Sequence, residues 1–314
     1  MCSERTIYRD IAVIRHYIRD GKAPGPNCTP DRLRWQIGAL RAEGYEFLTC
    51  GEITNRLLEN RTLPEKHVTL SFDDGLADQY TTAFPILKEL GVPATFFCIT
   101  CALDGELPPV IGFQILIERL GPRRLETEIL PKAFQGTPYL DLLDPKRYDV
   151  SGRKMGEPPE LRRIKWAFNH WPPQAFKREK LDELFAEYLG EGSQERCVRE
   201  WFMSDEQLRE MAGAGMEIGS HTRTHHALDV TGLEDIEQEL EASRRRLRKE
   251  VSGAAARSFA WPFGGDFRPA ARKLAANWYE SAWNFRSALT KMPEGVYDDL
   301  TDIPRLNEQV FSPT

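Results

Sequence analysis

Short apolar runs with a period of two alternate along this chain with longer stretches whose apolar residues recur every three or four positions. The clearest short run covers residues 68–72, where apolar and polar side chains alternate, and it predicts a buried strand. Helical periodicity precedes this run at 29–45 and follows it at 78–91. The alternation of strands with helices predicts an α/β protein with a parallel sheet, closed or open, and with functional residues at the carboxyl ends of its strands.

Helix boundaries are marked by residues that favour caps. Thr29 is a predicted N-cap, and Pro30 stands at the first helical position, where its missing N–H is tolerated. Gly91 is a predicted C-cap, and Pro85 is expected to kink the helix that ends there. Ser204 is the predicted N-cap of a later helix.

Residues 104–200 break the alternation of strands and helices. This stretch is far longer than an ordinary connection and is rich in proline and charge. Its apolar periodicity over 173–190 indicates a helix, so we expect an ordered helical insertion and not a disordered linker. The chain, 1–314, is then one domain with this insertion, whose position predicts a role in substrate selection.

Two adjacent aspartates, Asp73 and Asp74, end the predicted strand and precede Gly75. Asp-Gly is a common turn dipeptide, so one interpretation is a turn that simply ends the strand. Two carboxylates at the mouth of a strand repel each other and lose hydration unless a cation lies between them. The other interpretation is therefore that one carboxylate binds a metal ion while its neighbour acts as a base.

Histidines would complete such a metal site. Three of the six histidines, His221, His225 and His226, lie in the segment EIGSHTRTHHAL. Histidines four positions apart in a turn can face one ion, although such residues can also be solvated or packed in a core. Two histidines and one carboxylate leave a zinc ion with an open position, as hydrolytic zinc sites require.

Together these segments resemble the polysaccharide deacetylase family, which shares the NodB homology domain. SFDDG is similar to the first motif of the family and HTRTH to the second. The segment at 91–100 resembles the next buried strand, FAWPFG at 259–264 resembles the third motif in a variant without arginine, and AVIRHYI at 12–18 resembles the first strand. The resemblance implies a distorted (β/α) barrel of about seven strands with a helical insertion.

The resemblance also implies roles for individual residues. Asp74, His221 and His225 would hold a divalent metal, either zinc or another ion such as Co²⁺, Ni²⁺ or Mn²⁺. Asp73 would be the general base. The backbone N–H of Phe263 would stabilise the oxyanion of the reaction.

Two departures from the family pattern affect the expected mechanism. Ala260 stands where many members carry an arginine that pairs with the base, so Asp73 must be oriented by another group. No histidine follows His226, which itself lies outside the ligand positions, so the usual general acid of the family is absent. Arg305 lies in the corresponding last strand but stays protonated, so we expect it to stabilise charge or bind substrate. The preferred proton donor is Asp73 acting twice, with water or His170 as alternatives.

Further substrate contacts are expected next to the third motif. Trp261 and Trp283 are candidates for stacking on a sugar ring, although tryptophan is also common in cores. With Pro262 and Arg305 they form the predicted substrate-binding set. WPFGG is also compatible with a tight turn that buries a phenylalanine.

The composition agrees with an enzyme of this kind without identifying one. The 314 residues are 41% hydrophobic and 29% charged, which suffices for one large core. The net charge of −6 gives no footprint for nucleic acid, and the basic cluster at 244–250 follows an equally acidic stretch, as in an ion-paired helix. The longest apolar stretch, at 92–103, is too short to span a membrane.

The amino-terminal sequence and the cysteines favour a cytoplasmic location. The chain begins with charged residues and no apolar signal segment. Six cysteines at irregular spacings suit a reducing compartment, and Cys98 and Cys101 are expected to be buried thiols on opposite faces of a strand. The oligomeric state is not predicted.

We therefore predict a zinc-dependent hydrolase that removes an N-acyl group, with acetyl expected, from an amino sugar or glycan precursor. A cytoplasmic location favours a small, lipid-linked or nucleotide-linked substrate. Two alternatives stay open. One is hydrolysis of a non-sugar amide or formamide at the same site, and the other is a sugar-binding module that keeps the fold without turnover.

Overall fold

The computed structural model describes residues 29–144, 146, 159–169, 172–264, 267–285 and 297–305. The strand predicted at 12–18 lies outside these ranges, as does His170, the alternative proton donor. No described helix is long and apolar enough to cross a membrane.

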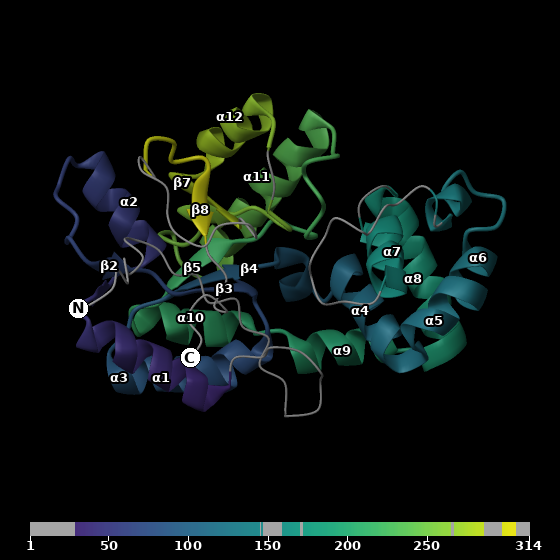
Figure 1. Ribbon diagram of the computed structural model, residues 1–314, viewed down its shortest axis with the longest axis horizontal. Helices are drawn as coiled ribbons and strands as arrows, with labels where there is room; N and C mark the ends of the chain where they lie inside the picture. The colour runs from purple at the N-terminus through teal and green to yellow at the C-terminus, as the bar shows by residue number, and fades with distance from the viewer. Residues whose placement is uncertain are drawn as a thin grey trace, which may run out of the picture.

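Six parallel strands form the central sheet. Each strand from β3 to β8 pairs with the next one in chain order, as repeated strand–helix units require. The sheet curls into a half-barrel, which confirms the predicted α/β fold with a parallel sheet (Figure 1). Its strands are β3 (Ser71–Asp74), β4 (Thr95–Cys98), β5 (Glu217–Ser220), β6 (Ser258–Ala260), β7 (Ser281–Phe285) and β8 (Ile303–Arg305).

A separate two-stranded parallel sheet precedes the half-barrel. It consists of β1 (Glu46–Phe47) and β2 (His67–Val68). The predicted strand at 68–72 is therefore divided, because its first residue pairs with β1 while β3 starts only at Ser71.

Helices cover the outer face of the half-barrel. In Figure 1, α1, α3 and α10 lie below the curved sheet, and α11 and α12 lie above it. All five helices contribute to the same core. The main core lies between these helices and the sheet, where Phe72 and Phe96 stack with ring centroids 4.7 Å apart. The bounds of the covering helices are α1 (Pro30–Ala42), α3 (Phe84–Leu90), α10 (Asp205–Gly213), α11 (Leu233–Glu250) and α12 (Pro269–Trp278).

The concave side of the sheet has a smaller core, which α2 (Cys50–Leu58) closes at one end. Inward-pointing Phe97 and Trp283 belong to the same apolar cluster as Ile53 of α2. The first turn of α2 donates to the amino-terminal residues of two strands, with Cys50 N 2.9 Å from Thr95 Oγ1 and Gly51 N 2.7 Å from Glu217 Oε2. Helix α2 therefore covers the amino ends of β4 and β5.

The predicted caps set the ends of three helices. The Thr29 side chain accepts a hydrogen bond from Arg32 N at 3.2 Å, and the Ser204 side chain caps α10. Gly91 ends α3 with a left-handed φ of 59°. The helix expected over 78–91 is divided into a π-helical turn followed by α3, with Pro85 in the first turn of α3, where its lost N–H is tolerated.

Between β4 and α10 the chain forms the insertion, a set of helices with its own core. Figure 1 shows α4 to α8 on the side of the sheet opposite α2. Phe113 and Phe168 stack in this core at 4.1 Å. A 3₁₀ helix (Thr100–Asp104) leads from β4 into the insertion, which contains α4 (Pro109–Leu120), α5 (Pro122–Arg124), α6 (Leu130–Ala133), α7 (Pro159–Asn169), α8 (Gln174–Leu189) and α9 (Ser193–Trp201).

Both stems of the insertion are tied to α11 by one arginine. Arg246 Nε lies 2.6 Å from Asp104 Oδ1, just before the insertion. The same guanidinium binds both carboxylate oxygens of Asp205, just after it, at 3.0 and 2.9 Å. These pairs hold the two ends of a long excursion together, and they raise the pKa of Arg246.

The two cysteines of CITC are buried thiols, as predicted, but they do not lie on one strand. Strand β4 ends at Cys98, and Cys101 lies in the 3₁₀ helix that follows. Burial raises the pKa of both thiols, that of Cys101 to about 12, so both stay protonated and unreactive.

Candidate metal centre

Sheet register brings the acidic pair and the histidines to the same end of the half-barrel. Asp74 pairs with Cys98 of β4, and Cys98 pairs with Ser220 of β5. Asp74 and Ser220 therefore lie at the same level, two strands apart, and His221 follows Ser220 directly. Residues far apart in sequence meet here because the carboxyl ends of parallel strands share one edge.

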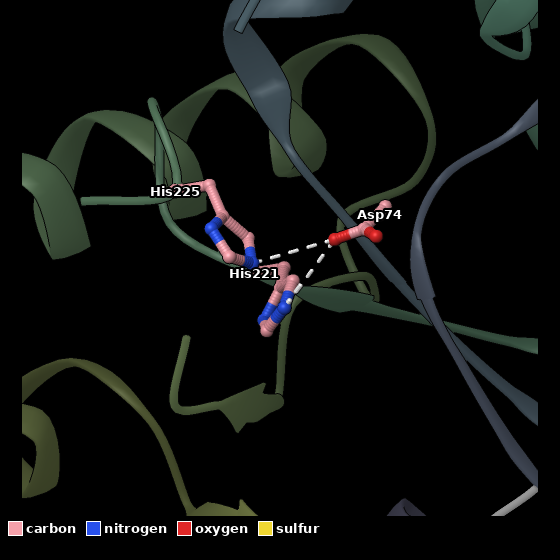
Figure 2. A group of neighbouring side chains, drawn as sticks. All are labelled: Asp74, His221 and His225. Atoms are coloured by element: carbon pink, nitrogen blue, oxygen red, sulfur yellow. Dashed lines mark ion pairs between the residues drawn. The ribbon is translucent and has the colours of Figure 1, made fainter. Parts of the chain in front are cut away.

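Asp74, His221 and His225 form a buried cluster (Figure 2). Asp74 Oδ1 lies 3.6 Å from His221 Nε2 and 3.5 Å from His225 Nε2. Ligand atoms about 2.0–2.1 Å from a tetrahedral ion are themselves roughly 3.3–3.5 Å apart. These two separations are close to that spacing, and all three ligand atoms lie within 4.8 Å of one another, so the three residues could hold one divalent ion.

His221 is held in the tautomer that a metal ligand needs. Its Nδ1 donates to the carbonyl oxygen of Ala260 at 2.8 Å, which leaves the lone pair on Nε2. His221 Nε2 is buried, and it has no hydrogen-bond partner among the described residues. Burial lowers the pKa of His221 to about 4, so the ring is neutral at physiological pH. A buried, neutral nitrogen aimed at a carboxylate fits a metal ligand.

Backbone strain is concentrated around this cluster. Six described residues other than glycine have a positive φ, and four of them are Asp74 (78°), Thr222 (66°), His225 (58°) and Phe263 (62°). Such conformations cost of order 1–3 kcal/mol each and persist where the surroundings fix them. Part of that support is the hydrogen bond from His225 N to Thr222 Oγ1, at 2.9 Å. The left-handed turns aim side chains that ordinary strand ends would not bring together.

Asp73 lies beside the cluster and is held by Arg305. Arg305 Nη1 donates to Asp73 Oδ1 at 2.7 Å, and Nη2 donates to Oδ2 at 2.9 Å. Both side chains are almost completely buried, and Ser71 Oγ accepts a further bond from Arg305 at 3.2 Å. Asp73 Oδ2 is also 3.9 Å from His221 Nε2. The bidentate pair holds Asp73 in a fixed orientation next to the cluster.

Arg305 takes the place of the arginine that is missing at Ala260. The small side chain of Ala260 points into the half-barrel, and the guanidinium that pairs with Asp73 comes from β8 instead. Arg305 also lies over the Phe97 ring, with its guanidinium carbon 5.3 Å from the ring centroid. Arg305 was predicted to stabilise charge or bind substrate. The structure gives it a charged partner within the protein, and its 1% exposure leaves no surface for a substrate contact.

Arg305→Met is expected to lower the free energy of unfolding by about 3 kcal/mol, because it leaves the buried Asp73 carboxylate without its cation. Adding Asp73→Asn should recover part of this loss, since the stranded charge is then removed. Denaturant unfolding of the parent, both single variants and the double variant measures the coupling between the two residues. Additive losses would show that the pair does not act as a unit.

The third motif forms a tight turn that presses Phe263 against the cluster. The Phe263 and His225 rings meet edge to face with centroids 4.6 Å apart. Gly264 follows with a φ of 69°, and a Cβ atom there would lie 2.1 Å from the carbonyl oxygen of Phe285. Only glycine fits this close approach, so the turn that places Phe263 depends on Gly264.

Gly264→Ala is therefore expected to lower the free energy of unfolding by at least ~2 kcal/mol, because the new methyl group meets backbone and not a movable side chain. Gly213→Ala is the matched control. Gly213 lies in α10 with open space around it, so alanine there should be neutral or slightly stabilising. Denaturant unfolding compares the two, and equal stabilities would contradict the close contact at Gly264.

The predicted aromatic substrate contacts are core residues in this structure. Trp261 and Trp283 have no exposed surface, and Pro262 is also buried. Trp261 stacks on Phe267 at 4.1 Å and donates its Nε1–H to Thr301 O at 3.0 Å. Because their faces and their polar atoms are occupied inside the protein, these indoles offer no stacking surface to a sugar. Both indoles are therefore core residues in this structure.

Three comparisons with known proteins point to polysaccharide deacetylases. The family model for polysaccharide deacetylases matches residues 60–113 and 186–279, and the unmatched part between them falls within the insertion. The poly-beta-1,6-N-acetyl-D-glucosamine N-deacetylase of Escherichia coli K12 is 41% identical over 81 residues, which cover 26% of this chain and 12% of that protein. The matches to curated relatives cover a quarter or less of each relative.

Solved structures share the fold along nearly the whole chain. The Streptococcus pyogenes deacetylase PplD, in complex with acetate, superposes with a TM-score of 0.56 at 17% identity, covering 96% of each chain. IcaB from Ammonifex degensii gives a TM-score of 0.54 at 18% identity, covering 95% of this chain and 91% of that one. The fold and the site together define an α/β half-barrel whose buried Asp-His-His cluster could hold a metal ion. Within that class, the resemblance to the polysaccharide deacetylase family that the motifs carry is confirmed.

Proposed function

We propose that this protein is a metal-dependent hydrolase that removes the N-acetyl group from an amino sugar within a glycan or glycan precursor. The observation that carries the proposal is the buried Asp74, His221 and His225 cluster, whose ligand atoms lie within 4.8 Å of one another, beside the arginine-paired Asp73. Zinc is the proposed ion because two imidazoles and one carboxylate suit it, although other divalent ions share these preferences. A relative named for poly-beta-1,6-N-acetyl-D-glucosamine supports a polymer of that sugar as one substrate class.

The proposed chemistry assigns one task to each residue. When bound, a divalent ion supplies Lewis-acid polarisation of the amide carbonyl and lowers the pKa of water. Asp73, held in place by Arg305, accepts a proton from the attacking water. The backbone N–H of Phe263 donates to the developing oxyanion. Asp73 then returns its proton to the leaving amine. Outside HTRTHH, the one histidine among the described residues is His67, which bonds Tyr297 and does not belong to the cluster.

A panel of N-acylated substrates tests the proposal. The zinc-loaded protein is incubated with N-acetylglucosamine oligomers of β-1,6 and β-1,4 linkage, nucleotide-linked N-acetylglucosamine, N-formyl sugars and simple acetamides. Release of acetate from the sugars is the expected result. Release from acetamides or formamides alone would support the non-sugar amide hydrolase, and binding of sugar without release would support the inactive module. We also propose a cytoplasmic location. Acetate release from the oligomers but not from the nucleotide-linked sugar would argue against that location.

A further inference from the structure

The loop that carries both histidine ligands is held from several sides. From the sheet side, the backbone N–H groups of Thr100 and Cys101 donate to Thr222 O at 3.2 Å and to Arg223 O at 2.9 Å. From α11, Glu239 accepts from Thr224 N at 2.8 Å and from Thr224 Oγ1 at 2.6 Å. These contacts belong to the half-barrel itself, and they leave the last part of the loop to be held by something else.

The insertion supplies the remaining contacts. Arg223, midway between the two ligands, donates to Glu106 Oε1 at 2.8 Å and to Oε2 at 3.0 Å. Glu106 in turn pairs with Arg178 of α8. The carboxylate of Glu106 therefore links the ligand loop to α8, and the two arginines lower its pKa against the effect of burial.

The residue before Arg178 on α8 contacts the other end of the loop. Lys177 Nζ lies 3.4 Å from Nδ1 of His226, the residue directly after ligand His225. The ammonium also donates to Asn169 O, at the end of α7. Lys177 is only 2% exposed, and burial lowers its pKa to about 7, while the charge of Glu239 acts in the opposite direction. A lysine is retained here despite the cost of desolvating its charge, which points to a specific contact and not to packing alone.

Helix α8, which carries Lys177 and Arg178, is packed in the core of the insertion. Leu181, Leu184 and Phe185 anchor it in the core of the insertion. Gly112 of α4 allows close packing, since a Cβ there would lie 3.1 Å from the Leu181 side chain. Helix α8 thus reaches one side of His225 directly, through Lys177 and His226, and the other side through Glu106 and Arg223, so it can fix the position of that ligand.

From these contacts we propose that the insertion clamps the ligand loop, with Lys177 and Glu106 acting as positioning residues that hold His225 in its left-handed conformation for metal binding. This inference rests on the proposed metal site. It gives the insertion a role in forming the site, beyond the substrate selection that its position predicted. A conformation that costs of order 1–3 kcal/mol relaxes when its supports are removed, and the ligand then leaves the position that the ion requires.

Lys177→Met tests the clamp, because methionine fills similar space without the ammonium. Glu106→Ala is the second variant, and it removes the link at a half-exposed position where folding should tolerate the change. Lys180→Met is the matched control, since Lys180 lies on the same helix and contacts Glu179, Glu183 and Phe176, none of which belongs to the loop. Zinc affinity is measured by chelator competition, and amide hydrogen exchange of 221–228 is measured in the metal-free full chain.

We expect the two clamp variants to bind zinc about 10- to 100-fold more weakly than the parent, as is usual when a group supporting a ligand is lost. Their loop amides should exchange faster, while exchange in β3 to β6 stays unchanged. Lys180→Met should match the parent in both measurements. Unchanged affinity and exchange in Lys177→Met and Glu106→Ala would overturn the clamp. If the parent binds no zinc, the proposed function fails, and the exchange rates alone still decide whether the insertion holds the loop.

Discussion

Replacing Asp73 with asparagine is expected to lower turnover by roughly 10²- to 10⁴-fold, the usual contribution of a positioned base, while the metal stays bound. Asparagine keeps the shape of the side chain and an acceptor for Arg305, but it cannot take up a proton. Asp73 lies next to ligand Asp74 without being needed as a third protein ligand, because His221 and His225 complete the set. The expected phenotype is thus a folded, metalated and slow enzyme.

Acetate release and metal content per chain, measured on the same Asp73→Asn sample, decide this prediction. The unfolding midpoint serves as the control for the changed partner of Arg305. A variant that loses the metal yet keeps full activity per bound ion would reverse the roles of the two aspartates.

His221→Ala and His225→Ala are each expected to abolish stable metal binding and, with it, activity. A hydrolytic zinc site usually has three protein ligands, and two do not hold the ion firmly. Asp74→Asn should have the same effect, because it removes the carboxylate that lies 3.5–3.6 Å from both imidazoles. Elemental analysis after dialysis gives the metal content of each variant.

A histidine remote from the cluster provides the control for these variants. His67 bonds Pro64 O and Tyr297 OH through its two ring nitrogens, at 2.8 and 2.7 Å, and does not belong to the metal cluster. His67→Asn should keep one ion per folded chain. Metal content at the level of the parent in His221→Ala or His225→Ala would show that the cluster is not the metal site.

The sequence predicted those parts of the fold and the site that depend on local signals. Caps depend on the residues next to them in sequence. Thr29 and Ser204 begin helices and Gly91 ends one, as predicted. Asp74 and His221 could be placed at strand ends because each stands where a strand pattern ends, and parallel register brings such ends together. His225 follows His221 by four positions in the loop after β5. The two sequence motifs thus supply the three residues of the cluster.

The parts that could not be predicted depend on the curl of the sheet and on side-chain packing across it. The pairing of Arg305 with Asp73 requires β8 to face β3 across the half-barrel, and no local pattern at 303–305 contains that information. The missing arginine at Ala260 was a signal that another cation must be near Asp73, but not which one. Whether Trp261 faces a ligand or the core is likewise decided by its neighbours Phe259 and Phe267.

Titration of metal-stripped protein with zinc, followed by acetate release from an N-acetylglucosamine oligomer, measures whether turnover depends on one bound ion. We expect no release without zinc, a linear rise up to one equivalent per chain, and a plateau beyond it, because one cluster of three ligands would hold one ion. Asp74→Asn should show no rise over the same range. Full acetate release by stripped protein in the presence of a chelator would contradict a metal-dependent deacetylase.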